Sequence, residues 1–365
     1  MTPKISTMVL DGGPCGGKTT AQAIIQQEIS ERGAVVLAAP EAATELIMAG
    51  ITPARYGAKF QPRLIARLLQ TEEFFRRSAE DIDAKQVLIL FDRGGMTAKA
   101  YMSESEWRQL LSDLKCSEVD LRERRYDGVI HFRTAAIGAE QYYTCANNAA
   151  RRETPEEARA LDERTLQAWL GHPHLRILDN STDFNTKVKR AVSEVCHILG
   201  VPEPSEIERK YRVQPVELVQ IPVPWNEFRI VQTYLRPATP QDERRIRARG
   251  QNGDWIYYET IKRPVSDSVR TRIETERIIT EREYVELSHE ADPTRWVIRK
   301  RRVTFIWKNH CFELDIFAYP KKGLHLLEVE LSDEDEVVEM PPFLSVIEEV
   351  TGDPEYRNAT MALLH

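Results

Sequence analysis

The chain has 365 residues and a formal net charge of −7, with 42% hydrophobic and 29% charged side chains. These proportions are typical of a globular protein with enough apolar residues for two cores, and they exclude a collagen-like, disulfide-stapled or wholly disordered chain. Both halves are slightly acidic, with 26 basic and 28 acidic side chains before residue 206 and 24 and 29 from there on. This balance excludes a general nucleic-acid-coating protein, which needs excess basic charge.

The five cysteines are odd in number, widely spaced and form no CxxC pair. This pattern indicates a reducing compartment and argues against a zinc site. The N-terminal residues lack the long apolar core of a signal peptide, and no apolar run reaches the roughly 20 residues that span a bilayer. We therefore expect a cytoplasmic protein without a transmembrane segment.

The first 200 residues alternate short apolar runs with longer helical patterns, which predicts βαβ units around a parallel sheet. The expected strands are residues 5–10, 34–38, 87–91, 128–132 and 175–178. The expected helices are residues 22–32, 61–81, 104–115, 155–170 and 186–199. This part of the sequence therefore predicts an α/β domain over residues 1–200.

The character of the sequence changes after residue 200. Residues 201–205 (VPEPS) have the composition of a linker. From residue 206 to 365, helical periodicity is scarce and apolar and polar residues alternate with period two, which indicates antiparallel strands. We expect one last helical piece at residues 342–351.

A glycine-rich motif follows the first expected strand and precedes the first helix. Residues 12–19 (GGPCGGKT) fit the G-x-x-x-x-G-K-[ST] pattern of a phosphate-binding P-loop. Glycines let backbone N–H groups turn inward around phosphate oxygens, and the helix N-terminus adds partial positive charge. The predicted nucleotide-binding residues are Gly12, Gly13, Gly16, Gly17, Lys18 and Thr19, with Lys18 on the β- and γ-phosphates and the Thr19 hydroxyl on Mg²⁺.

Acidic and basic residues near other strand ends extend this site. Asp92 ends the third expected strand, where a carboxylate can bind Mg²⁺ through water or accept a proton from a hydroxyl substrate; the alternative is a capping role in the turn. Glu41 either faces the same cleft or caps a surface helix. Arg151 and Arg152 begin a segment that is either a lid closing over the transferred phosphate or a solvated charged helix.

These residues together resemble the nicotinamide-riboside-kinase-like P-loop family over about residues 5–200. The resemblance rests on the P-loop, Pro40-Glu41-Ala42, Asp92-Arg93-Gly94, Arg151-Arg152-Glu153 and Leu178-Asp179-Asn180. It implies a domain that binds ATP or GTP with Mg²⁺ and acts like a kinase.

The second half carries charged residues at alternate positions of several expected strands. Alternate residues of a strand share one face. The sets that share a face include Glu206, Glu208 and Lys210; Arg245, Arg247 and Arg249; Thr260 and Lys262; Arg272, Glu274 and Glu276; Lys300 and Arg302; Glu313 and Asp315; and Glu328 and Glu330. Either these faces point into water, or a closed barrel gathers them in one lumen where acids bind metal and bases bind phosphate.

The order of these motifs resembles the CYTH, or triphosphate tunnel metalloenzyme, superfamily over about residues 206–360. The resemblance implies an eight-stranded antiparallel tunnel, a triphosphate-containing small molecule as ligand, and Mg²⁺ or Mn²⁺. It implies that Glu206, Glu208, Glu328 and Glu330 hold metal or orient water, that Glu206, Glu208 and Lys210 are catalytic, and that phosphates are held by Lys210, Arg245, Arg247, Lys262, Arg272, Lys300 and Arg302. Asp92 is the catalytic candidate of the P-loop half, from its place at the end of a strand.

The fusion of the two domains resembles the TRP-translocation-defect-protein-like family, which implies GTP binding and adds a phosphoinositide as a candidate partner. The leading hypothesis is a two-domain, metal-dependent phosphohydrolase whose P-loop domain binds ATP or GTP. The alternative is a non-catalytic regulatory protein that binds GTP and phosphoinositide. Nucleic acid is not an expected partner, because neither half is basic and no aromatic–basic platform is evident.

Overall fold

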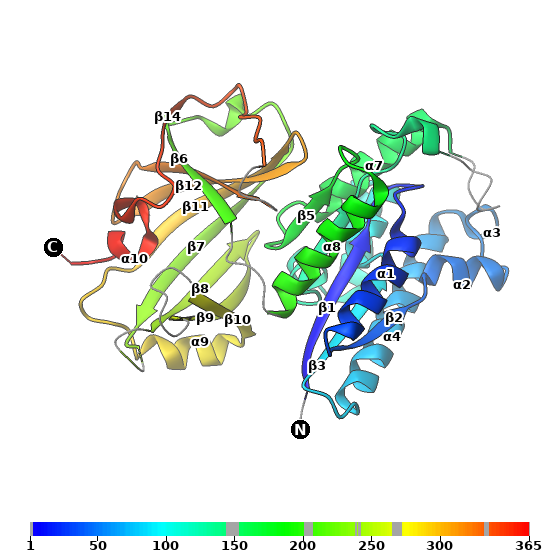
Figure 1. Cartoon of the computed structure of the whole chain (residues 1–365), viewed down its shortest axis with the longest axis horizontal. Helices are drawn as coiled ribbons and strands as arrows, with labels where there is room; N and C mark the ends of the chain where they lie inside the picture. Colours follow the sequence, from blue (N-terminus) through cyan, green and yellow to red (C-terminus); the bar gives the residue numbers. More distant parts are fainter. Residues whose placement is uncertain are drawn as a thin grey trace. The chain divides into compact units, whose positions relative to one another are not determined.

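The computed structural model describes residues 3–143, 153–200, 207–237, 239, 242–264, 272–331 and 336–364. It divides into two compact units, Met1–Glu203 and Pro204–His365, which are described separately (Figure 1). In the described ranges no helix is both long and apolar enough to cross a bilayer.

The first unit is a five-stranded, fully parallel sheet with strand order β2-β3-β1-β4-β5. Its strands are β1 (Lys4–Asp11), β2 (Val35–Ala39), β3 (Gln86–Asp92), β4 (Gly128–Phe132) and β5 (Leu175–Leu178). Its α-helices are α1 (Lys18–Glu31), α2 (Ala42–Met48), α3 (Pro53–Tyr56), α4 (Phe60–Glu80), α5 (Glu104–Leu114), α6 (Glu118–Arg122), α7 (Pro155–Trp169) and α8 (Phe184–Leu199). Short 3₁₀ segments are η1 (Gly57–Lys59), η2 (Gly95–Tyr101) and η3 (Glu140–Tyr142). The expected α/β fold with a parallel sheet is confirmed.

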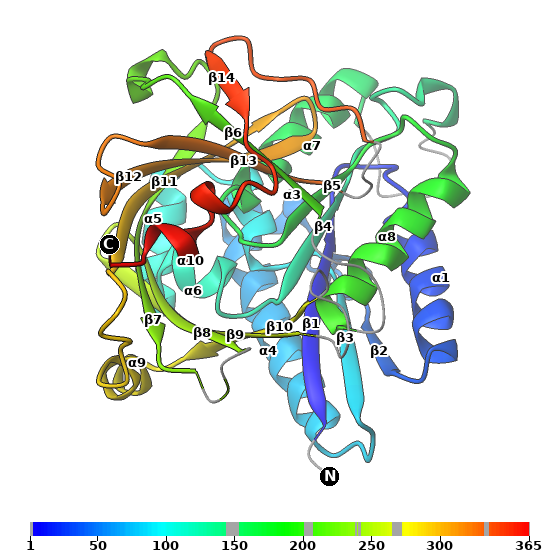
Figure 2. The ribbon, with the colours of Figure 1, turned by 60° about the vertical axis from the view of Figure 1, so that its left-hand side comes forward.

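Helices cover both faces of this sheet, so its strands are apolar throughout rather than alternating. Helices α1 and α8 pack side by side over one face (Figures 1 and 2), where Ile25 and Val195 join a core with Leu10, Leu90 and Ile130 from the strands. Helix α4 and the η2 segment pack on the other side of the strands. The carboxyl ends of β1 and β3 therefore open beside the start of α1, where the P-loop lies.

The second unit is one antiparallel sheet with strand order β10-β9-β8-β7-β11-β12-β13-β6-β14. Its strands are β6 (Ile207–Val213), β7 (Trp225–Leu235), β8 (Glu243–Gln251), β9 (Asp254–Pro264), β10 (Arg272–Ile279), β11 (Ile298–Trp307), β12 (His310–Tyr319), β13 (His325–Leu331) and β14 (Val346–Glu349). Its helical segments are η4 (Leu218–Gln220), α9 (Glu281–Ser288), η5 (Pro354–Tyr356) and α10 (Asn358–Met361). The antiparallel sheet is confirmed with nine strands where eight were expected, since β14 adds a short strand beside β6.

The apolar face of this sheet is covered by segments of the same unit. Phe305, Phe312 and Leu327 pack on this outer face against Ile221, which follows η4, and Leu344, which precedes β14. Helix α9 covers β8, β9 and β10 in the same way. Because these apolar side chains are covered on the outer face, the opposite face of the strands, which carries the alternating charged residues, is the one that points inward.

The expected helix at residues 342–351 is wrong. Residues 346–349 form β14, which pairs antiparallel with β6 through Val346↔Val213, Glu348↔Arg212 and Glu349↔Tyr211. Leu344 just before it is buried in the outer-face core. A partner strand more than 130 residues earlier overrides the local pattern, and β-branched Val346 and Ile347 fit the extended conformation.

Candidate active sites in the two units

The P-loop connects the end of β1 to α1. Gly12 has φ +135°, and a Cβ on it would lie 2.0 Å from the Phe132 carbonyl oxygen, so only glycine fits there. The buried ammonium of Lys18 donates to the carbonyl oxygens of Gly12 and Gly13, each at 2.9 Å. Thr19 lies in the first turn of α1 and is exposed. The predicted P-loop residues are thus brought together in one turn.

Acids and a cation from three strand ends converge on Lys18. Burial lowers the pKa of Lys18 to about 8, with the nearby Arg93 cation adding to the effect and the charges of Asp92, Asp11 and Glu41 opposing it. Burial raises the pKa of Asp92, and its Oδ1 is buried without a hydrogen-bond partner among the described residues. A carboxylate oxygen in that situation can hold a cation or accept a proton from a hydroxyl.

Arg93 holds this acidic corner together. Its guanidinium pairs with Glu41 at 3.0 Å and lies 3.6 Å from Asp11, which is fully buried at the end of β1. Asp11 also accepts from the backbone N–H of Gly12 at 2.7 Å, from the Thr97 hydroxyl at 2.6 Å and from the Trp169 indole. Glu41 thus contacts Arg93 at the end of β3, and it also accepts a hydrogen bond from the Thr44 hydroxyl in the first turn of α2.

The predicted lid is described only in part. Arg151 and Arg152 lie outside the described residues. On α7, which follows them, Arg159 donates to the carbonyl oxygen of Ala136 at 2.7 Å and Arg164 to that of Ala100 at 3.0 Å. These two arginines are thus engaged with backbone carbonyls.

The lumen of the second unit holds a chain of ion pairs between its acidic and basic strands. Lys210 on β6 pairs with Glu328 on β13 at 2.9 Å and with Glu208 at 3.5 Å. Arg302 on β11 pairs with Glu328 at 3.0 Å, with Asp315 at 2.7 Å and with Glu313. The fully buried Asp315 also pairs with Lys300. These seven lumen residues therefore meet, with acids and bases interleaved.

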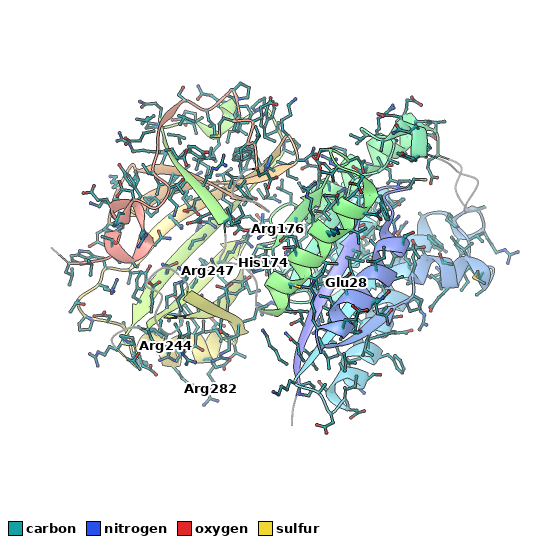
Figure 3. All side chains as sticks on the ribbon, in the orientation of Figure 1. Glu28, His174, Arg176, Arg244, Arg247 and Arg282 are labelled. Carbon is teal, nitrogen blue, oxygen red and sulfur yellow. The ribbon has the colours of Figure 1, made fainter. Side chains whose placement is uncertain are left out.

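The opposite part of the lumen comes from β8, β9 and β10. Arg247 pairs with Glu276 at 2.9 Å, and the Thr260 hydroxyl donates to the same carboxylate at 2.7 Å. By strand pairing, Arg245 stands opposite Thr260 on the same face. Arg244, the neighbour of Arg245, belongs to the outer face instead and pairs with Glu259; Figure 3 labels Arg244 and Arg247.

Several lumen cations lie over the faces of aromatic rings. Arg247 lies over Tyr258 with 4.8 Å to the ring centroid, Arg249 over Phe228 with 3.5 Å, and Lys300 over Phe317 with 5.2 Å. Such rings restrict the cations while stabilising their charge. Arg301 is different, because it lies on the exposed outer face with both guanidinium bonds to Glu227.

The sheet curls so that its two ends face each other. Lys262 on β9 lowers the pKa of Glu208 on β6, although six strand positions separate these strands in the order. Burial and the charges of Glu328 and Glu330 outweigh this and raise the pKa of Glu208. Both Lys262 and Glu208 are on the lumen faces of their strands.

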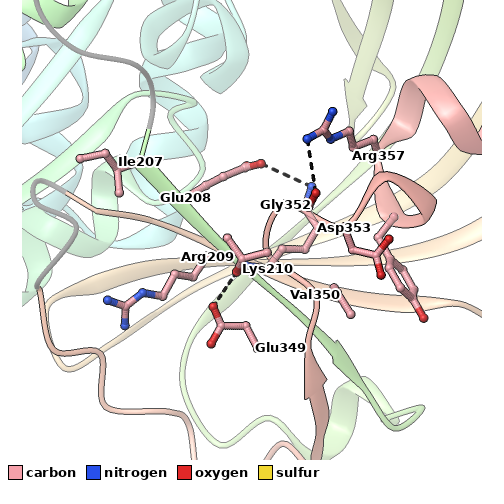
Figure 4. A pocket seen from close by; sticks show the side chains of 11 residues that line it. Ile207, Glu208, Arg209, Lys210, Glu349, Val350, Gly352, Asp353 and Arg357 are labelled. Atoms are coloured by element: carbon pink, nitrogen blue, oxygen red, sulfur yellow. Dashed lines mark hydrogen bonds and ion pairs between the residues drawn. The ribbon is translucent and has the colours of Figure 1, made fainter. Parts of the chain in front are cut away.

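A pocket of about 400 Å³ opens beside Glu208 and Lys210 (Figure 4). Its far wall is the segment after β14, where Arg357 donates to the carbonyl oxygen of Gly352 at 3.3 Å. Glu208 is about half exposed toward this pocket. At another position the lumen is apolar, because Met361 and Ala362 of the C-terminal segment pack on the inward-facing Tyr234, Ile298, Phe317 and Leu326.

Two predicted lumen residues are not fully described. Glu206 lies outside the described residues. The backbone of Arg272 begins β10, and nothing is described of its side chain.

Comparisons with known proteins fit these two sites. The family model of an AAA domain matches residues 7–187. An inorganic triphosphatase from Nitrosomonas europaea is 33% identical over 164 residues, which is 44% of this chain and 97% of that protein. The chain belongs to the inorganic triphosphatase family. A further inorganic triphosphatase, from Acetivibrio thermocellus, is 38% identical over 65 residues, 18% of this chain and 40% of that protein.

Solved structures give partial matches. A crystal structure of an inorganic triphosphatase is 28% identical, covers 45% of this chain and 97% of its own, and has a TM-score of 0.33. A NadR protein in complex with NAD and AMP-PNP is 16% identical, covers 55% of this chain and 51% of its own, and has a TM-score of 0.39. The sequence relatives and the P-loop model together confirm the expected fusion of a P-loop domain with a triphosphatase-type tunnel.

The lumen of this triphosphatase-family chain suits a divalent cation by its donor chemistry. Burial and the charges of Glu328 and Glu330 raise the pKa of Glu208, and strand pairing places Glu330 directly opposite Glu208. Carboxylate oxygens are the donors that Mg²⁺ and Mn²⁺ favour. Within the described ranges no three His, Cys, Asp or Glu side chains form a chelating group, and Glu328 is paired with Lys210 and Arg302.

Sequence reasoning missed two acids of the P-loop unit. The role of Asp11 could not be predicted, because it directly precedes the glycine motif and its position fits the end of a strand equally well. Asp162 lies on α7, 149 residues from the Gly13 amide that it binds at 2.8 Å. Only the three-dimensional fold brings that pair together.

Proposed function

We propose that this protein is a phosphohydrolase whose tunnel cleaves the terminal phosphate from a triphosphate-containing small molecule with the help of Mg²⁺ or Mn²⁺. We propose further that the P-loop unit binds ATP or GTP with Mg²⁺. The observation that carries the tunnel proposal is the buried network of Lys210, Arg302 and Glu328, in which bases that can grip phosphate alternate with acids that can bind metal. Membership of the inorganic triphosphatase family supports the same activity.

The bases of the lumen would hold the phosphate oxygens. The Arg302 guanidinium presents several N–H donors in a plane, which suits two oxygens of one phosphate. Lys300 and Lys210 add point charges on either side, and Arg247 lies on the β8 wall. Such fixed cations neutralise the charge that develops on phosphoryl oxygens during transfer.

The carboxylates would hold the cation and handle the proton. Glu208, Glu328 and Glu330 are the described residues whose oxygens would bind a divalent ion. That ion would supply positive charge to the phosphates and acidify a water molecule. Glu208 would also be placed to accept the proton of an attacking water, because its side chain is about half exposed and lines the pocket beside Lys210.

The chemical step follows from these positions. The water oxygen bonds to the terminal phosphorus, the bond from that phosphorus to the bridging oxygen breaks, and the water proton passes to Glu208. The bridging oxygen leaves with its electron pair on diphosphate, where Lys210 and Arg302 neutralise the new charge.

In the P-loop unit, Lys18 would move from the Gly12 and Gly13 carbonyls to the β- and γ-phosphates. The Thr19 hydroxyl and Asp92 would hold Mg²⁺, directly or through water. The pairing of Glu41 with Arg93 beside Asp92 supports an acceptor site for a hydroxyl substrate next to the γ-phosphate. Transfer of that phosphate to such an acceptor is the kinase-like part of the proposal.

The test is phosphate release from tripolyphosphate, ATP and GTP with Mg²⁺ or Mn²⁺, for wild type, Glu208→Gln, Lys18→Ala and Glu227→Gln. Glu227 lies on the outer face of β7 and serves as the matched acidic control. We expect tripolyphosphate release to fall at least about 100-fold in Glu208→Gln, because loss of a proton acceptor typically costs 10²–10⁴ in rate. Lys18→Ala and Glu227→Gln should retain that release.

Unchanged release in Glu208→Gln would refute the tunnel site. Release from ATP or GTP that disappears only in Lys18→Ala would place nucleotide hydrolysis in the P-loop unit. If no substrate releases phosphate while nucleotide still binds, the chain is a binding protein, and vesicles containing phosphoinositides become the next ligand to test.

A further inference from the structure

Asp162 is a buried residue of α7 whose carboxylate accepts a hydrogen bond from the P-loop backbone. Its Oδ1 accepts from the backbone N–H of Gly13 at 2.8 Å and from that of Thr134 at 3.0 Å. The His131 Nε2 donates to the same oxygen at 3.2 Å, and the Arg133 guanidinium donates to Oδ2 at 2.9 Å. The side chain is fully excluded from solvent, so all of these contacts are made without competition from water.

Gly13 and Asp162 are sterically matched. A Cβ on Gly13 would lie 2.7 Å from Asp162 Oδ1 and 2.8 Å from Asp162 Cβ, closer than carbon atoms can approach. The absence of a side chain at Gly13 is therefore what lets α7 come near enough to bind the P-loop backbone. The P-loop motif itself leaves this position open, since any residue is allowed between its two defining glycines.

The charge of Asp162 is compensated locally. Burial alone would raise its pKa, but the hydrogen bond and charge of His131 and the Arg133 guanidinium hold that pKa well below its usual range. A lone carboxylate next to a phosphate-binding loop would repel the ligand. With the Arg133 guanidinium bonded to its other oxygen, Oδ2, the carboxylate can bind the loop backbone at a reduced electrostatic cost to an anion there.

The contacts join three pieces of chain. The Thr134 hydroxyl donates to the Pro14 carbonyl of the P-loop, and the Ala135 N–H donates to the Cys15 carbonyl at 3.3 Å. Asp162 thus fixes the loop after β4, the first half of the P-loop and α7 relative to one another.

We propose that Asp162 is a positioning residue of the nucleotide site: it sets the shape of the P-loop for phosphate and ties α7 to it, without touching the nucleotide. This inference rests on the proposed binding of ATP or GTP. Nucleotide affinity should then depend on a residue of α7 that makes no contact with phosphate.

The test measures the Kd of N-methylanthraniloyl-ATP and -GTP with Mg²⁺ for wild type, Asp162→Asn, Gly13→Ala, Lys18→Ala and Glu163→Gln. Asp162→Asn should raise the Kd about 10-fold or more, because a charge-assisted bond to a buried donor is weakened and an amide N–H is placed against other donors. Gly13→Ala should raise it similarly by pushing the loop off Asp162. Glu163→Gln is the matched control: Glu163 pairs with the same Arg133 at 3.0 Å but has no bond to the P-loop, so its Kd should stay within about twofold.

A double variant separates positioning from a general loss of stability. Replacing Asp162 by glycine removes both Oδ1 and Cβ, the two atoms that a Gly13→Ala methyl would strike, so Gly13→Ala with Asp162→Gly should bind no worse than Gly13→Ala alone. Kd losses that simply add would indicate independent structural damage and would overturn the proposal. If the Asp162 variants fail to fold, as judged by near-UV circular dichroism, Gly13→Ala alone decides.

The outcomes distinguish this inference from the proposed function. Wild-type affinity in Asp162→Asn together with lost affinity in Lys18→Ala would overturn the inference and leave nucleotide binding standing. Failure of the wild type to bind either nucleotide would refute the nucleotide function, and the positioning role with it.

Discussion

Glu328→Gln tests the lumen network through stability as well as activity. The Glu328 carboxylate is 12% exposed and accepts from Lys210 at 2.9 Å and from Arg302 at 3.0 Å. Glutamine keeps an acceptor oxygen but loses the charge. Since a hydrogen bond to a charged group contributes about 1.5–3 kcal/mol and a neutral one about 1 kcal/mol, two weakened bonds cost about 2–3 kcal/mol. For a unit of this size, that cost lowers Tm by roughly 4–12 °C.

The pH dependence provides a second signature of the same variant. Burial would raise the pKa of Glu328, but the charges of Lys210 and Arg302 outweigh it and hold the pKa well below its usual range. Its stabilising contribution is therefore fully present above the unfolded-state pKa of about 4.3 and is lost as the pH falls toward the folded-state pKa. The difference in free energy of unfolding between wild type and Glu328→Gln should be largest at pH 6–8 and shrink below about pH 4.

Calorimetric melting of the full chain at several pH values measures this difference. Glu227→Gln is the control, because its pair with Arg301 is exposed and such pairs contribute about 0–1 kcal/mol. The reasoning is refuted if Glu328→Gln melts within about 1 °C of Glu227→Gln at pH 7. A gap that stays constant between pH 3.5 and 7 would refute it equally.

Three further predictions concern single residues. Burial lowers the pKa of Lys18 to about 8, and only the charged form of Lys18 attracts phosphate. The Kd for ATP or GTP should therefore rise as the pH increases from 7 to 9 in a fluorescence titration. The Lys18→Ala variant should lose both the affinity and this pH dependence. Asp92→Asn should retain nucleotide binding within a few-fold but lower any phosphoryl transfer by about 100-fold or more, measured with labelled γ-phosphate; equal transfer would show that Asp92 only caps its turn. Arg302→Lys keeps the charge but loses the planar fork that reaches Asp315 and Glu313, so we expect KM for tripolyphosphate to rise about 10-fold; an unchanged KM in steady-state assays would remove Arg302 from the phosphate site.

Local pattern predicted much of the fold. The five parallel strands were expected within a residue or two, because strands buried on both faces read as apolar runs between helical patterns. The start of α1 lies four residues before the expected one, because Lys18 and Thr19 of the P-loop already belong to its first turn. The helix expected at residues 342–351 is instead strand β14. Its extended conformation depends on pairing with β6, which lies far away in the sequence.

The candidate sites divide in the same way. Residues that carry charge at alternate positions of one strand, such as Lys300 and Arg302, could be assigned to one face from the sequence. Which carboxylate each base meets could not, because Arg302 bonds across two strands to Glu328. The roles of Asp162 and Trp169 could not be predicted for a similar reason. The sequence around an acid or an indole in a helix does not indicate which loop that side chain contacts.

The ion pairs of the lumen make the tunnel resemble an ion exchanger. Lys210, Arg302 and Lys300 already have carboxylate partners, so an entering anion must replace those partners instead of meeting bare cations. An ion with one phosphate group cannot compensate for several broken pairs, whereas a chain of three phosphates replaces them together. If the proposed function holds, we expect the tunnel to favour ligands that carry several negative charges and to bind ions of low charge weakly, even when those ions are small enough to enter.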